Sequence, residues 1–135
     1  MAKSIEALEG IGPSYGAKLR AVGCGSPDKL LRGGATRKGR REIAAKTGIR
    51  EAVILRCVNM ADLYRIKGVA TQYAELLEAA GVDTVKELKN RNAKNLAQAM
   101  SEINEKKQLV RQVPNEKMVT AWVAHAKKLK AGVSY

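Results

Sequence analysis

Apolar residues recur along most of the chain at intervals of three and four positions, which is the spacing of one face of an α-helix. Two amphipathic segments show it best: Val53, Ile54, Cys57, Val58 and Ala61, and Met118, Val119, Trp122, Val123 and Ala126. Phenylalanine is absent, and no run alternates apolar and polar residues as a half-buried strand would. The pattern therefore predicts an all-α protein.

The pattern also repeats after 58 positions, so that residues 5–30 align with residues 63–88 without a gap. The identical pairs include Gly10 and Gly68, Tyr15 and Tyr73, Leu19 and Leu77, Gly23 and Gly81, and Leu30 and Leu88. Ser26 aligns with Thr84, where a hydroxyl is expected to cap the next helix. Residues 49–63 resemble 113–129 once the second copy is given about seven extra residues, which places Cys57 opposite Trp122. We expect both tyrosines and Trp122 to pack in the core.

This periodicity predicts two units, residues 1–60 and 61–135, that share one core. Each unit is expected to contain a helix, a tight glycine turn, a second helix, a short helix and two longer helices. The fold class predicted is thus an all-α tandem repeat.

The segment LEGIGPSYGAKL, residues 8–19, resembles the helix-hairpin-helix motif, in which an apolar residue stands between two glycines. Gly10 is expected to end the first helix at a positive φ, and Ile11 to be buried between the helices. Gly12 would let the backbone approach a ligand, and Pro13 would begin the second helix. The outward amides and the helix dipole then form an anion site suited to a nucleic-acid phosphate.

The second copy of the motif reads IKGVATQYAELL, residues 66–77, and has Ala70 in place of the second glycine. Lys67 adds positive charge and Thr71 a hydroxyl, but the extra Cβ at Ala70 opposes close approach of a phosphate. We expect the first hairpin to bind better than the second.

Lysine and arginine outnumber aspartate and glutamate by 25 to 13, which gives a net charge of +12. Such a charge is typical of a protein with a polyanionic partner. Between Lys29 and Arg41 the chain has six basic residues and no acid. This run favours a phosphate-facing patch, although a solvated helix face has the same appearance.

We therefore expect a non-catalytic protein that binds nucleic-acid backbones with little sequence preference, double-stranded DNA more than RNA. The residues expected to contact nucleic acid are Gly10, Ile11, Gly12, Ser14, Lys18, Arg37, Lys38, Arg40, Arg41, Lys67, Gly68, Val69, Ala70 and Thr71. An adaptor that binds an acidic protein explains the charge equally well, and an exposed hydrophobic patch on the long helices would favour it. Binding of RNA or the ribosome is a third alternative.

Other chemistry has little support in the sequence. Two separate cysteines and a single histidine match no metal-ligand spacing, and no cofactor is expected. His125 is expected on a solvated or edge position, and Cys24 could be exposed, but neither has a catalytic partner. We expect no enzyme activity. The charged first residues differ from a signal peptide and no run of about 20 apolar residues occurs, so a cytoplasmic location without membrane insertion is expected.

Nearly the whole chain resembles a bacterial family of paired helix-hairpin-helix proteins described as a domain of unknown function. The resemblance rests on IEALEGIGPSYGAKL, GATRKGRREIAAKTGI and NMADLYRIKGVATQYAELLEAAGVDTVKEL. It implies a tandem helix-hairpin-helix fold of the SAM-like kind. It implies DNA binding only by analogy with other proteins that carry the hairpin.

Overall fold

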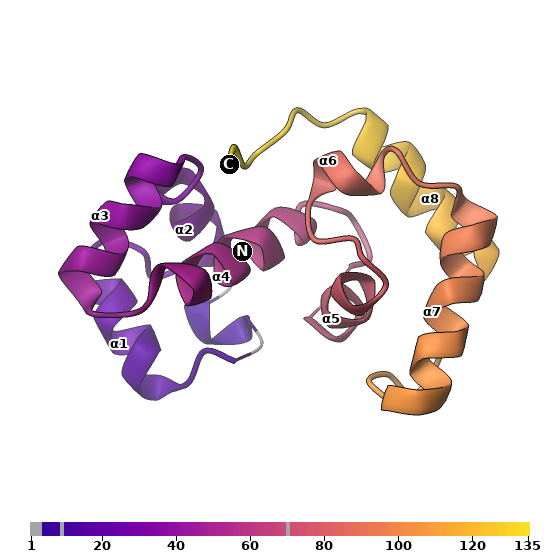
Figure 1. Ribbon diagram of the computed structural model, residues 1–135, viewed down its shortest axis with the longest axis horizontal. Helices are drawn as coiled ribbons and strands as arrows, with labels where there is room; N and C mark the ends of the chain where they lie inside the picture. The colour runs from indigo at the N-terminus through magenta and orange to yellow at the C-terminus, as the bar shows by residue number, and fades with distance from the viewer. Residues whose placement is uncertain (1–3, 9, 70) are drawn as a thin grey trace. The chain divides into compact units, whose positions relative to one another are not determined.

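The computed structural model describes residues 4–8, 10–69 and 71–135, with the side chain of Thr71 left aside. Its described residues form helices and connecting turns, with none in a strand, as the periodicity predicted. The helical elements are η1 (Ile5–Ala7), α1 (Pro13–Ala21), α2 (Pro27–Gly33), α3 (Arg37–Thr47), α4 (Glu51–Leu63), α5 (Thr71–Ala79), α6 (Val85–Leu88), α7 (Ala93–Lys107) and α8 (Glu116–Lys127) (Figure 1).

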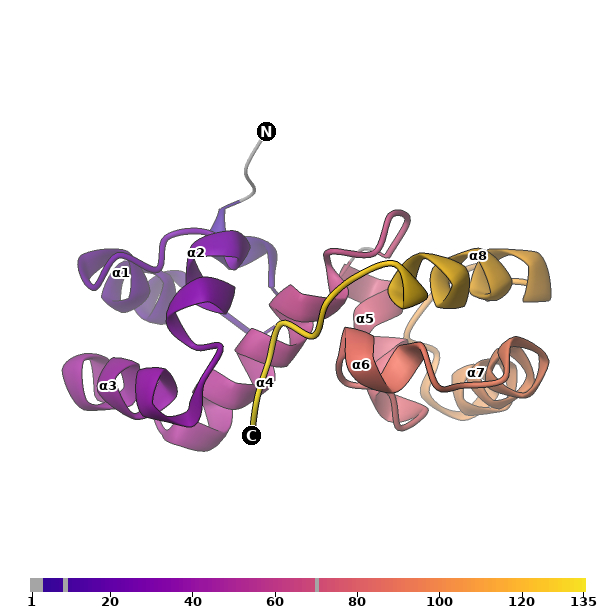
Figure 2. The ribbon, with the colours of Figure 1, turned by 90° about the horizontal axis from the view of Figure 1, so that it is seen from above.

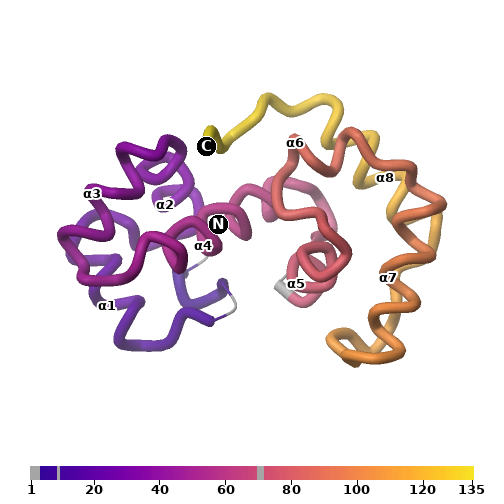
Figure 3. Tube along the Cα trace, viewed as in Figure 1, coloured from indigo at the N-terminus to yellow at the C-terminus, as the bar shows by residue number. Residues whose placement is uncertain are grey.

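The chain divides into two compact units. The first comprises Met1–Asp62 and Gly132–Tyr135, and the second comprises Leu63–Ala131. The last four residues, which the repeat pattern assigns to the second unit, thus belong to the first. Their backbone is held there because the Ser134 amide donates to the carbonyl of Ala35, at 2.8 Å, in the connection between α2 and α3 (Figure 3).

In the first unit, α1 and α2 pack on α3, and the buried residues of α3 follow helical spacing at Arg40, Ile43 and Thr47. Two glycines allow a close approach. A Cβ on Gly34 would collide with Val58 of α4, and a Cβ on Gly39 would collide with the backbone of Gly33. Gly34 and Gly39 are therefore required by packing between α2, α3 and α4.

In the second unit, α7 and α8 run side by side in opposite directions, and α5 packs on α7 (Figures 1 and 2). The side chains of α8 that face this core are Val119, Trp122, Val123 and Ala126. Trp122 is 3% exposed and its ring lies 5.4 Å from that of Tyr73, so the expected place of Trp122 in the core is confirmed. Tyr73 itself is half-buried, and its hydroxyl donates to the Gln112 carbonyl.

Positions 58 residues apart have the same local geometry. Gly10 and Gly68 have φ of 87° and 93°, and Gly23 and Gly81 have φ of 82° and 91°. The amides after the latter pair both return to a buried leucine: Cys24 donates to Leu19 at 2.8 Å and Val82 to Leu77 at 2.9 Å.

The following helix is also capped alike in the two units. The Ser26 hydroxyl accepts from the Lys29 amide at 3.3 Å, and the Thr84 hydroxyl accepts from the Glu87 amide at 3.2 Å. Both caps were expected from the alignment of these hydroxyls, and both are confirmed.

Candidate functional site

The turn that joins η1 to α1 is called hairpin 1, and its described residues are 8 and 10–14. Gly10 has the left-handed conformation expected of it, and Ile11 is 6% exposed, which confirms its burial. Gly12 is the N-cap of α1 and Pro13 is its first residue, where a missing amide hydrogen costs nothing. Hairpin 1 is therefore a buried apolar residue followed by an exposed helix start.

Gly12 is a glycine that the fold does not require. Its φ is −88° and its ψ is −177°, which any residue adopts, and a Cβ built on it would have no atom within 4 Å. Glycine also leaves α1 without a side-chain cap. The starts of α2, α3, α6, α7 and α8 differ in this, because each has a capping side chain: Ser26, Thr36, Thr84, Asn92 and Asn115.

The absence of a cap has a direct chemical consequence. The first amides of a helix have no partner within the helix, so they bind a side-chain cap, water or a ligand. At α1 no atom lies within 4 Å of a Cβ built on the N-cap Gly12, so neighbouring groups do not crowd the N-cap at the positive end of the helix dipole. Ser14 and Lys18 are exposed on the same helix. The start of α1 can therefore accept an anion.

An ion pair holds α1 against η1. The Glu6 carboxylate bonds to the Arg20 guanidinium and to the Ser4 hydroxyl, and these contacts lower the pKa of Glu6 below its usual value, the Ser4 hydrogen bond first. Gly16 makes this approach possible, because a Cβ there would collide with the Glu6 side chain. The pair occupies Arg20, and Lys18 remains the exposed cation of α1 nearest to hairpin 1 in the sequence.

Arg56 lies at hairpin 1, a position that was not predicted for it. Its Nη1 would be 3.1 Å from a Cβ on Gly10, and its side chain is exposed on α4. The second unit has a parallel: Nε1 of Trp122 would be 3.2 Å from a Cβ on Gly68. Cys57, which follows Arg56, aligns with Trp122 in the repeat, so the same part of each unit lies beside its turn glycine.

The turn between α4 and α5, called hairpin 2 and spanning residues 66–72, is held by α8. Its Val69 is 5% exposed and Lys67 is exposed. The Lys67 amide donates to Nδ1 of His125 at 3.1 Å, and Trp122 lies against Gly68. Ala70 and the Thr71 side chain, both expected at the interface, lie outside the described residues. Half-buried His125 thus has a structural role, as an acceptor for a backbone amide.

The basic run expected to face phosphates is divided by the fold. Arg37, Lys38 and Arg41 are exposed near the start of α3, and Nε of Arg41 lies 3.6 Å from Oε1 of Glu51. The start of α3 and the start of α1 lie at opposite ends of the first unit (Figure 1). The structure therefore does not bring these three cations to hairpin 1.

Arg40 departs from the expectation, because it is only 5% exposed. Its Nη1 donates to the Gly34 carbonyl at 2.9 Å and to the Ala35 carbonyl at 3.2 Å, while Nη2 donates to the Ser134 carbonyl at 2.8 Å. Its guanidinium also lies 5.9 Å from the Tyr135 ring centroid. A cation with these partners joins the α2–α3 connection to the C-terminal segment, so Arg40 is removed from the candidate interface.

Groups for catalysis or metal binding are sparse in the part of the chain that the structure describes. It contains no cluster of three or more histidine, cysteine, aspartate or glutamate side chains that could hold a metal ion. Cys24 is 4% exposed, so the expectation that it could be exposed is wrong, and burial raises the pKa of its thiol. None of the described helices is both long and apolar enough to cross a membrane.

These features define an all-helical, strongly basic protein with two compact units. The chain belongs to a protein family described as a domain of unknown function, DUF4332, whose model matches residues 9–129. No solved structure matches the chain.

Proposed function

We propose that the protein is a non-catalytic binder of the sugar-phosphate backbone of nucleic acid, duplex DNA before RNA, and that its two units are a tandem helix-hairpin-helix repeat. The observation that carries the proposal is Gly12. A glycine that neither backbone conformation nor packing requires is explained if a ligand approaches the uncapped amides of α1.

Charge supports a phosphate as that ligand. The chain carries +12, and Ser14, Lys18 and Arg56 are exposed on or beside hairpin 1. Hairpin 2 is the weaker contact in this proposal, because its Lys67 amide is already satisfied by His125. Arg37, Lys38 and Arg41 provide a second positively charged surface on the first unit.

The adaptor alternative would be favoured by an exposed hydrophobic patch on the long helices. Among the described residues, the one large hydrophobic side chain that is exposed is Tyr135, at 71%. The described residues therefore offer no apolar docking surface that would favour a protein partner.

The test is a titration of the purified protein, freed of nucleic acid, into a labelled duplex of about 25 base pairs at several salt concentrations. If about four phosphates are neutralised, log affinity should fall with log salt with a slope of roughly −4. Gly12→Asp should weaken binding about tenfold or more, because the new carboxylate caps the amides of α1 and repels phosphate. Circular dichroism should show unchanged helix content.

The matched control is Asn92→Asp, which changes the total charge equally and also places an aspartate at a helix N-cap, that of α7. It should retain affinity close to that of the parent protein. Affinity that does not depend on salt, or an equal loss in both variants, would overturn the proposal.

A further inference from the structure

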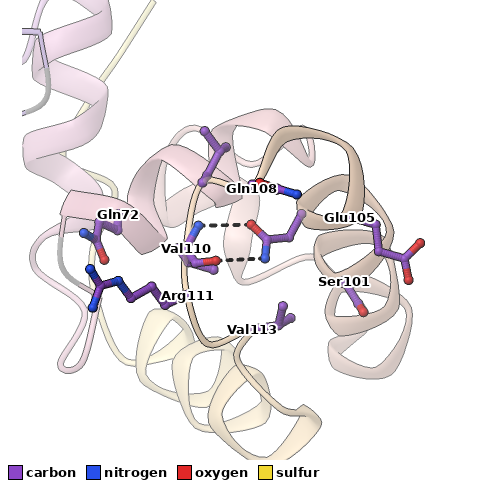
Figure 4. Close-up of a pocket in the computed structure, with 9 residues that line it drawn as sticks. Gln72, Ser101, Glu105, Gln108, Val110, Arg111 and Val113 are labelled. Atoms are coloured by element: carbon purple, nitrogen blue, oxygen red, sulfur yellow. Dashed lines mark hydrogen bonds between the residues drawn. The ribbon is translucent and has the colours of Figure 1, made fainter.

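A polar groove of about 630 Å³ lies in the second unit, between the first turn of α5, the last turns of α7 and the connection to α8 (Figure 4). Its size is within the range of roughly 300–1,000 Å³ typical of small-molecule sites. Its lining includes Gln72, Ser101, Glu105, Gln108, Leu109, Arg111 and Val113.

The wall formed by the α7–α8 connection is held in an unusual conformation. Gln108, which ends α7, has a φ of 50°, a left-handed conformation that residues with a side chain rarely adopt. Buried Asn104 holds the backbone at Val110, which is two residues after Gln108. The amide nitrogen of Asn104 donates to the Val110 carbonyl and its oxygen accepts from the Val110 amide, both at 3.0 Å. The corresponding connection in the first unit, from α3 to α4, is residues 48–50 only. The second unit thus has an additional, rigidly held wall.

Apart from Glu105 and Arg111, the side chains of the lining are uncharged, and they suit a flat ligand that has apolar faces and polar edges. Leu109 and Val113 offer apolar surface, whereas the carboxamides of Gln72 and Gln108 and the hydroxyl of Ser101 can each donate and accept hydrogen bonds. A carboxamide can donate to and accept from the edge of a nucleobase at the same time.

Arg111 adds a charge on the side of the groove nearest to hairpin 2. Figure 4 shows its guanidinium directed toward Gln72, while Ser101 and Glu105 stand on the other side, on α7. Gln72 is in the first turn of α5, directly after hairpin 2. A phosphate bound by Arg111 would therefore have its own base within reach of the groove.

From this arrangement we infer that the groove is a binding site for a single unpaired nucleobase, with Arg111 contacting the phosphate of the same nucleotide. The inference rests on the proposed function and adds to it a preference for nucleic acid that contains an unpaired nucleotide. A base can enter such a groove only after it leaves the stack, so the protein prefers single strands or duplexes with an extrahelical nucleotide to fully paired duplex.

The test compares three labelled DNAs at one salt concentration: a fully paired duplex, the same duplex with one bulged thymidine, and the single strand. The parent protein should bind the bulged duplex about tenfold more tightly than the paired one, the effect of one good set of base contacts. Ser101→Trp fills the groove and Arg111→Gln removes the phosphate contact, and each should reduce that ratio to about one. The affinity for paired duplex, which hairpin 1 determines, should change little.

Lys94→Gln, which removes one exposed charge at the start of α7, is the control for Arg111→Gln and should keep the tenfold ratio. If Ser101→Trp loses helix content, the ratio of affinities measured for Arg111→Gln alone tests the inference. Salt-dependent binding without preference for the bulged duplex overturns this inference alone. Failure to bind any of the three DNAs overturns the proposed function as well.

Discussion

At the scale of single residues, four neighbouring cations of the same basic run have different physical roles. Arg37, Lys38 and Arg41 are exposed, whereas Arg40 is buried and donates to three backbone carbonyls. The charge of these residues alone does not show which of them is buried. Hydrogen bonds from a charged donor contribute more than neutral ones, and buried carbonyls left without a donor are costly.

Arg40→Gln should therefore lower the free energy of unfolding by roughly 2–3 kcal/mol, because the shorter amide cannot reach all three carbonyls. Arg37→Gln should change it by less than about 0.5 kcal/mol, because its side chain is solvated. Urea titrations of the two variants measure this difference. Equal free energies of unfolding would mean that the hydrogen bonds of Arg40 make no net contribution to stability.

At the scale of elements, the connection between α7 and α8 is a second place where one residue controls geometry. Gln108→Gly should raise the free energy of unfolding by about 0.5–1 kcal/mol, because glycine adopts the left-handed conformation without a Cβ penalty. Lys106→Gly, in the right-handed last turn of α7, should lower it by about 1 kcal/mol. Thermal unfolding of both variants tests whether the free energy of unfolding rises in the first and falls in the second. A destabilising Gln108→Gly would show that the glutamine side chain contributes more than its backbone costs.

The elements also show what a sequence can reveal. The turns at Gly10 and Gly68, the proline start of α1 and the hydroxyl caps at Ser26 and Thr84 could be predicted because their causes are local: a positive φ, a missing amide hydrogen, a nearby acceptor. The position of Arg56 beside Gly10 could not be predicted, because it depends on the packing of α4 against a turn far from it in the sequence.

The burial of Arg40 could not be predicted, because one of its acceptors, the Ser134 carbonyl, is 94 positions away. The groove of the second unit could not be predicted from the sequence for a related reason. It depends on the left-handed conformation of Gln108 and on the two hydrogen bonds between Asn104 and Val110. Glutamine and asparagine are common in helices and turns, so the sequence does not predict either feature.

At the scale of the whole molecule, a net charge of +12 on 135 residues opposes compaction through self-repulsion. Raising the salt concentration from about 0.01 M to about 0.15 M shortens the screening length from about 30 Å to about 8 Å. The free energy of unfolding should then rise, by on the order of 1 kcal/mol, while affinity for DNA falls. Urea unfolding at the two concentrations measures the first effect. A decrease would mean that ion pairs such as Glu6–Arg20 outweigh the repulsion.

The bond between Arg40 and Ser134 also relates the fold to protein synthesis. The carbonyl that accepts from Nη2 of Arg40 is synthesised 94 residues after Arg40, behind the entire second unit. Until then water must solvate that part of the guanidinium. The first unit is therefore complete only after the whole second unit has been translated, because its buried guanidinium lacks one acceptor until then.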